Sequence, residues 1–154
     1  METQTVLIVE SIFYSEISQA LMEGATNKLE KTQAKIEKIS VPGAFEIPAA
    51  VQFALDAKNR NELYNGFSGV IALGCIIQGE TDHHDYISRE ITRALMNIST
   101  QCRIPLGFGV LTVKNYEQAM ARANSKGDKD AGGKAALSCL RMIEISRQYS
   151  SLTI

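Results

Sequence analysis

The sequence has no excess of positive charge and few aromatic side chains. Sixteen Lys and Arg residues stand against 17 Asp and Glu residues, aromatic residues make up 6% of the chain, and tryptophan is absent. A net positive field attracts nucleic acids and anionic lipids, and aromatic rings provide surfaces on which bases stack. Because the chain has neither feature, we expect no nucleic-acid partner and no membrane partner.

Cysteines and long apolar runs are scarce too. Cys75, Cys102 and Cys139 form no C-x-x-C pair, which argues against a disulfide framework or a zinc knuckle, so we interpret them as reduced, mostly packed thiols. The longest near-continuous apolar run, 69–77, is about half of what a membrane-spanning helix needs. The first ten residues, METQTVLIVE, begin as a strand rather than as a secretion signal. We therefore expect a cytoplasmic protein.

Short Val- and Ile-rich runs alternate with longer segments of helical period. This alternating pattern is typical of an α/β sandwich, in which a mainly parallel sheet is covered by helices on both faces. The length of 154 residues fits one domain, 1–154. We expect Ser15 to cap the first helix and 75–82 to form a loop after the third strand. The predicted strands are 6–9, 35–40, 70–73 and 106–111, and the predicted helices are 15–29, 48–55, 87–98, 116–123 and 134–148.

Three unusual segments follow the predicted strands at 12–14, 41–46 and 78–85. Ligands of open α/β sheets bind beyond the carboxyl ends of the strands, where loops and helix N-termini gather. If the sheet is parallel, the three segments meet at one edge. The sequence therefore predicts a ligand site there.

The chain's two histidines, His83 and His84, are adjacent at a predicted loop-to-helix junction. An imidazole there can exchange protons near neutral pH, so one of them is a candidate general acid and base. The alternative is a surface pair that caps the helix. We expect no metal site, because neighbouring rings diverge and only Asp82 and Asp85 lie near enough in sequence to complete a ligand set.

Other residues near these segments allow two interpretations each. The Gly79-Glu80-Thr81 turn with Arg122 can bind an anion, or Arg122 is a solvated helix-surface residue. Phe13 either stacks on a flat ligand or closes the core. Glu46 either caps a helix or accepts hydrogen bonds from a polyhydroxyl ligand. The hydrolase elbow, the P-loop and the dinucleotide-binding motif are all absent from the sequence.

Three blocks in this order resemble the 6,7-dimethyl-8-ribityllumazine synthase family: VPGAFEIP at 41–48, LGCIIQGETDHHDYI at 73–87 and GVLTVxNxEQAxxRA at 109–123. The likeness runs from Val6 to about Arg147. It implies a flavodoxin-like three-layer sandwich with a four-stranded, mainly parallel sheet flanked by helices. It also implies a transferase of riboflavin biosynthesis that needs no cofactor and no metal. The enzyme would act as a homopentamer or a multiple of pentamers, with sites between adjacent subunits.

The resemblance also assigns roles to particular residues. It implies that His83 transfers protons, that Phe13 stacks on the pyrimidine ring, and that Phe108 comes from the neighbouring subunit. Ala44 and Glu46 would meet the ring edge and the ribityl chain. The other substrate-binding residues that it implies are Phe45, Ile76, Ile77, the phosphate-binding set Gly79, Glu80, Thr81 and Arg122, and a connector lysine, for which we choose Lys129 over Lys126 and Lys134.

The sequence also departs from the family pattern. Tyr14 replaces a usual asparagine, Gln78 replaces a usual basic residue, and His84 stands where an aromatic residue is usual. The connector 125–134 is longer than usual. These departures leave open a non-catalytic protein that binds flavins or lumazines, or forms shells, on the same fold; a flavodoxin-type electron carrier with bound FMN is a second alternative.

Overall fold

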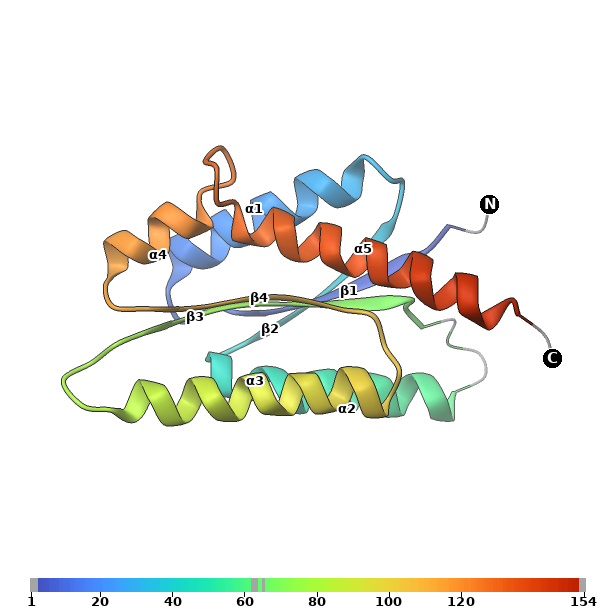
Figure 1. The fold of residues 1–154 in the computed structure, drawn as a ribbon, viewed down its shortest axis with the longest axis horizontal. Coiled ribbons are helices and arrows are strands. Elements are labelled where there is room, and N and C mark those ends of the chain that lie inside the picture. The colour runs from blue at the N-terminus through green and yellow to red at the C-terminus, as the bar shows by residue number, and fades with distance from the viewer. Residues whose placement is uncertain (1–2, 62–63, 65, 153–154) are drawn as a thin grey trace.

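Four parallel strands form the centre of the molecule in the computed structural model, which describes residues 3–61, 64 and 66–152. Their order in the sheet is β2-β1-β3-β4, and each neighbouring pair is parallel (Figure 1). The expected four-stranded sheet is therefore confirmed, and it is parallel throughout. The strands are β1 Thr5–Ser11, β2 Lys35–Val41, β3 Gly69–Ile77 and β4 Leu106–Val113.

Helices cover both faces of this sheet and make the expected three-layer sandwich, a flavodoxin-like arrangement (Figure 1). One layer holds α1, α4 and α5, and the other holds α2 and α3 with a short 3-10 turn, η1, before α2. No helix among the described residues is long and apolar enough to cross a membrane. The helical segments are α1 Ser15–Glu30, η1 Ala44–Glu46, α2 Ile47–Arg60, α3 His83–Gln101, α4 Tyr116–Ala123 and α5 Ala131–Ser150.

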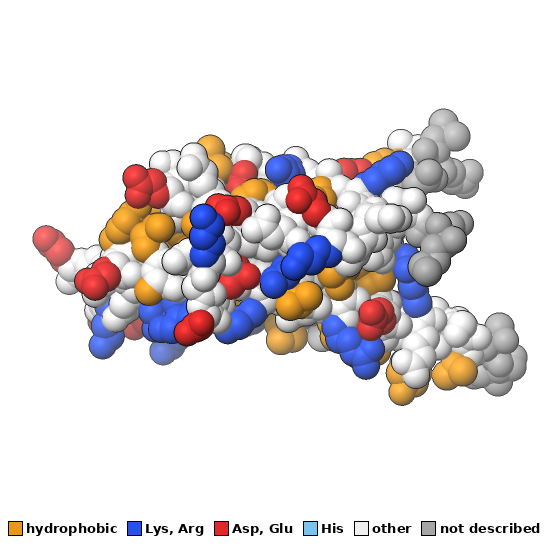
Figure 2. Space-filling model, turned by 90° about the horizontal axis from the view of Figure 1, so that it is seen from above, with side chains coloured by type: hydrophobic (Ala, Val, Ile, Leu, Met, Phe, Trp, Pro, Cys, Tyr) orange, Lys and Arg blue, Asp and Glu red, His pale blue; other side chains and the backbone are white. Residues whose placement is uncertain are grey.

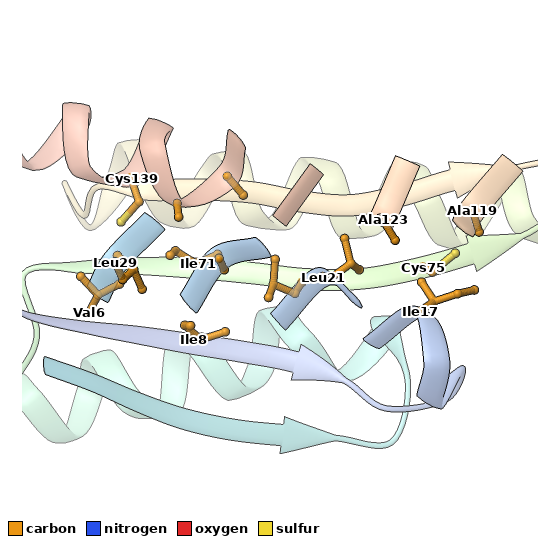
Figure 3. Close-up of a cluster of buried hydrophobic side chains, with 14 of the residues drawn as sticks. Val6, Ile8, Ile17, Leu21, Leu29, Ile71, Cys75, Ala119, Ala123 and Cys139 are labelled. Carbon is orange, nitrogen blue, oxygen red and sulfur yellow. The ribbon is translucent and has the colours of Figure 1, made fainter. Parts of the chain in front are cut away.

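Two apolar cores follow from the alternation of side chains along the strands. Val6, Ile8 and Ile71 point to the layer of α1, α4 and α5, where Leu21 and Cys139 meet them (Figure 3). The strand residues that alternate with these three along β1 and β3 point in the opposite direction, to α2 and α3. Because β3 is buried along nearly its whole length, it reads as a continuous apolar run rather than an alternating one.

The outer surface of α1, α4 and α5 carries mixed charge. Lys and Arg side chains lie among Asp and Glu side chains over this face, with no large area of one sign (Figure 2). A surface of this kind gives no electrostatic footprint for a nucleic-acid backbone.

Several element boundaries differ from the sequence-based predictions, among them the start of α3, which is His83 and not residue 87. Ser15 does not cap α1: the N-cap position is Tyr14, and its side chain makes no capping hydrogen bond. The segment 75–77 is not loop but the end of β3, because Cys75, Ile76 and Ile77 pair with the last residues of β4.

The start of α5 also lies earlier than predicted. The side chain of Asp130 accepts a hydrogen bond from the backbone N–H of Gly133 at 3.1 Å and caps a helix that begins at Ala131. A Cβ on Gly132 would lie 2.0 Å from the carbonyl oxygen of Leu21. Gly132, which the prediction places in the connector 125–134, therefore lies in α5 and allows this helix to pack closely on α1.

Candidate active site at the carboxyl ends of the strands

The carboxyl ends of β1, β2 and β3 surround a cavity of about 400 Å³, here called the strand-end cavity. The backbone joins the first two ends, since the N–H of Ile12 donates to the carbonyl oxygen of Val41 at 3.0 Å. The prediction that three distant segments meet at one edge is confirmed. The cavity is lined by Phe13, Tyr14, Gly43, Ala44, Phe45, Cys75, Ile76, Ile77, Gly79, Thr81, His83, His84 and Ile87.

Two larger hollows, of about 570 and 470 Å³, lie along α5 and along α1. Neither is lined by a histidine or an aromatic residue. Both histidines of the chain line the strand-end cavity instead. Acid-base groups and flat apolar rings therefore occur together at this edge of the sheet, and we take it as the candidate site.

Aromatic rings at the mouth of the cavity are strongly exposed. Phe13 is 71% exposed and Phe45 is 60% exposed, although both lie beside apolar core. The Phe13 ring meets the Tyr14 ring edge to face, with centroids 4.9 Å apart and an 80° angle between planes. Phe13 thus does not close the core; it presents a ring face on which a flat ligand can stack.

His83 is the first residue of α3, and its side chain is exposed at the cavity. Its backbone N–H donates to Oγ1 of Thr81 at 3.3 Å. Within the described residues its ring makes no hydrogen bond, which leaves both ring nitrogens free to exchange protons with a ligand. The capping alternative does not hold for His83, because the N-cap position of α3 is Asp82.

His84 is held by its surroundings. Its side chain is 13% exposed, Nε2 lies 3.1 Å from Oδ1 of Asp85, and Nδ1 lies 3.4 Å from the carbonyl oxygen of Thr81. The two adjacent imidazoles therefore differ: His83 is open to the cavity, and His84 is fixed between polar groups of its own segment.

Cys75 and Tyr14 also line the cavity. Burial raises the pKa of Cys75 to about 11, so its thiol stays protonated at neutral pH, as expected for a packed cysteine. Burial also raises the pKa of Tyr14, with a smaller contribution from Cys75, so its phenol stays neutral. Neither group is an activated nucleophile.

Glu46 and Glu80 adjoin the lining residues. Glu46 occupies the N-cap position of α2, yet its side chain makes no capping hydrogen bond, so of its two interpretations the cap is wrong. A Cβ on Gly43 would lie 3.1 Å from Oε2 of Glu46, which places this carboxylate beside a lining residue. Glu80 is exposed in the turn between Gly79 and Thr81.

Besides Glu46 and Glu80, three further predicted site residues do not line the cavity of their own chain. Arg122 is half-buried in the last turn of α4, where its Nη1 donates to the carbonyl oxygen of Gln118 at 3.1 Å. Lys129 is exposed before α5. Phe108 is 45% exposed on the edge strand β4, and because it lies two residues before Val110 it shares the strand face toward α2 and α3.

The lining also contains residues that we did not predict as binding residues. Gly43 and Tyr14 are next to predicted ones, and Ile87 belongs to the apolar stripe of α3 that the helical period identifies. His84 is the clearest omission, because its near-complete burial between two acceptors has no signature in the sequence. No group of three potential metal-ligating side chains occurs in the part of the chain that the structure describes.

Comparison with known proteins agrees with this geometry. The family model described as 6,7-dimethyl-8-ribityllumazine synthase matches residues 3–147. A protein of that name from Agrobacterium fabrum is 48% identical over 149 residues, covering 96% of this chain and 98% of its own. Another from Bartonella tribocorum is 44% identical over 144 residues, covering 94% of this chain and 91% of its own. A match of this extent and identity shows that the chain belongs to the 6,7-dimethyl-8-ribityllumazine synthase family.

Proposed function

We propose that the protein condenses 5-amino-6-ribitylamino-2,4-pyrimidinedione with 3,4-dihydroxy-2-butanone 4-phosphate. The products are 6,7-dimethyl-8-ribityllumazine, the direct precursor of riboflavin, together with phosphate and water. Membership of the family supports this reaction. The single observation that carries it is the presence of an exposed aromatic ring, Phe13, and an unpaired imidazole, His83, in one cavity.

The aromatic side of the cavity binds the pyrimidine in this proposal. Phe13 stacks on the ring, while Ala44 and Glu46 meet the ring edge and the ribityl hydroxyls. The carboxylate of Glu46 suits the second role, because it is exposed beside Gly43 and makes no helix-capping bond. Phe45, Ile76 and Ile77 form apolar walls that exclude water from the reacting amine.

The turn Gly79-Glu80-Thr81 binds the phosphate of the second substrate. Backbone N–H groups just before a helix favour an anion, and Gly79 lets it approach closely because no heavy atom lies within 4 Å of the Cβ position there. Arg122 adds the countercharge that a phosphate needs. The two substrates then lie with the amine near the ketone, which supplies the larger part of the rate enhancement.

His83 relays protons between the two substrates. The amine attacks the ketone, and a proton delivered to the departing hydroxyl releases water and leaves an imine. Removal of a proton from the adjacent carbon then expels phosphate and leaves an enol, which becomes a ketone when its terminal carbon takes up a proton. The second amine attacks this ketone, and loss of another water closes the ring. An imidazole whose nitrogens are free can give and accept protons at each step.

The proposed enzyme is a homopentamer or a multiple of pentamers, and neighbouring copies share each site. Phe108 supports this, because it is an exposed ring on an uncovered edge strand. Arg122 and Lys129 support it as well, because neither lines the cavity of its own chain. A neighbouring copy would bring these groups to the open mouth beside Phe13 and Phe45. The reaction itself requires no cofactor, and the cytoplasmic location stays a prediction.

The two-substrate reaction tests this proposal. Purified protein is mixed with both substrates, and lumazine is followed by its absorbance and fluorescence, with a reaction without protein as the measure of uncatalysed condensation. We expect turnover that needs both substrates. Binding of riboflavin analogues with no product above the uncatalysed rate would refute the enzyme and favour the binding or shell-forming protein, which family membership does not otherwise support.

A further inference from the structure

His84 has two polar contacts that the proposed chemistry does not use. Its ring lines the cavity beside His83, with Nε2 at 3.1 Å from the Asp85 carboxylate and Nδ1 at 3.4 Å from the Thr81 carbonyl oxygen. The ring thus bridges the first turn of α3 and the turn 79–81 before it. It is the more buried of the two imidazoles.

Both atoms that face the ring are acceptors. A carbonyl oxygen and a carboxylate oxygen accept hydrogen bonds, whereas a neutral imidazole has one donor nitrogen and one acceptor nitrogen. Only the imidazolium form can donate to both partners at once. A cation at a helix N-terminus opposes the helix dipole, and the carboxylate of Asp85 supplies the compensating charge.

Thr81 is held to α3 at two points. Its Oγ1 accepts a hydrogen bond from the backbone N–H of His83, and its carbonyl oxygen faces the His84 ring. At the other end, the backbone N–H of Gln78 donates to the carbonyl oxygen of Val113 at 2.9 Å, and the space beside Gly79 is open. The contacts of Thr81 therefore hold the end of the turn that adjoins α3.

We propose that His84 is a positioning residue for the phosphate-binding turn. The His84 ring, which contacts Asp85, holds the carbonyl group of Thr81 and thereby keeps the turn 79–81 in the arrangement that receives the phosphate of the butanone substrate. His84 acts through Thr81 and does not itself transfer a proton to the substrate. This inference rests on the proposed function for its substrate and on the contacts of His84 with Asp85 and Thr81 for its geometry.

Two reciprocal variants test the role of His84. His84→Phe keeps a flat ring of similar size and removes both donors, whereas His84→Gln removes the ring and keeps an amide donor. If hydrogen bonding positions the turn, His84→Phe raises the KM for the butanone phosphate roughly tenfold with kcat within about twofold, as expected for the loss of one charge-assisted hydrogen bond. His84→Gln stays within about threefold of wild type, because it can still donate to one acceptor.

A packing role gives the opposite order. His84→Phe would then match the wild type and His84→Gln would be impaired, and this result would overturn the proposal. Two unaffected variants, or two variants impaired to the same degree, would overturn it as well. Circular dichroism and thermal melts of both variants identify any loss of folding.

Amide hydrogen exchange supplies a readout that needs no turnover. Peptides covering 78–82 should exchange several-fold faster in His84→Phe than in the wild type or in His84→Gln, because the turn opens more often when Thr81 is released. Equal exchange in wild type and His84→Phe would overturn the inference. Absence of lumazine formation by the wild type would refute the proposed function, while the exchange rates would still decide the role of His84.

Discussion

Replacing Phe13 by Ala separates binding from folding at the proposed site. Phe13 is 71% exposed, so its removal leaves no internal cavity, and the free energy of unfolding should change by no more than about 0.5 kcal/mol. Stacking of a flat base on an aromatic ring contributes about 1–3 kcal/mol, which corresponds to a loss of roughly 5- to 150-fold in affinity for the pyrimidine. The KM for the butanone phosphate should change much less, because the phosphate binds at the turn 79–81.

The assay measures steady-state kinetics with each substrate varied in turn, together with equilibrium binding of the pyrimidine. Tyr149→Ala is a matched control: its ring is 66% exposed, but it lies near the end of α5, at the opposite end of the sheet from the cavity (Figure 1). Light scattering checks that both variants assemble like the wild type. Unchanged pyrimidine affinity in a correctly assembled Phe13→Ala variant would refute the stacking role.

Three further predictions concern protons, phosphate and thiols. His83→Ala should lower kcat by about 10²–10⁴-fold and leave measurable turnover, since a proton relay accounts for less than orientation does; wild-type kcat would contradict the relay. Arg122→Ala should raise the KM for the butanone phosphate roughly 10- to 100-fold with little change in kcat, and Arg122→Lys should recover part of the loss; an unchanged KM would remove Arg122 from the site. A thiol reagent at about pH 8 should label the exposed Cys102 and leave Cys75 and Cys139 unlabelled, because burial raises the pKa of Cys75 to about 11 and that of Cys139 to about 12. Mass spectrometry measures the labelling, and rapid labelling of Cys75 would contradict its buried state.

The layers of the fold were predictable from hydrophobic pattern because β3 and its neighbours are buried on both faces. Such strands must be apolar, and the helices that cover them repeat apolar residues with helical period. The residues at which helices and strands begin and end depend instead on contacts with distant segments of the chain. Segment 75–77 continues β3 because β4 is there to pair with it, and the early start of α5 depends on the contact between Gly132 and the backbone of Leu21.

The candidate site also has parts that could be predicted from the sequence and parts that could not. Its half formed by loops after β1, β2 and β3 could be predicted, since parallel strands bring their carboxyl ends to one edge whatever the details of packing. The place of His84 could not, because a histidine held between two acceptors has the same sequence as one exposed to water. Phe108 and Lys129 entered the prediction through family resemblance, and Arg122 entered it first as a possible partner for an anion. The geometry of a single chain brings none of the three to the lining of the cavity.

In the proposed assembly, the exposed rings would connect the site to the contact between copies. Phe13 and Phe45 together present a large apolar area at the cavity mouth, which a folded chain normally covers with ligand or with protein. A ligand that stacks on Phe13 would leave part of Phe45 exposed, and in the proposed assembly the exposed Phe108 of another copy would cover that part. Assembly and substrate binding would then bury parts of one surface, and weakening the contact between copies should weaken pyrimidine binding even where no substrate-binding residue is altered.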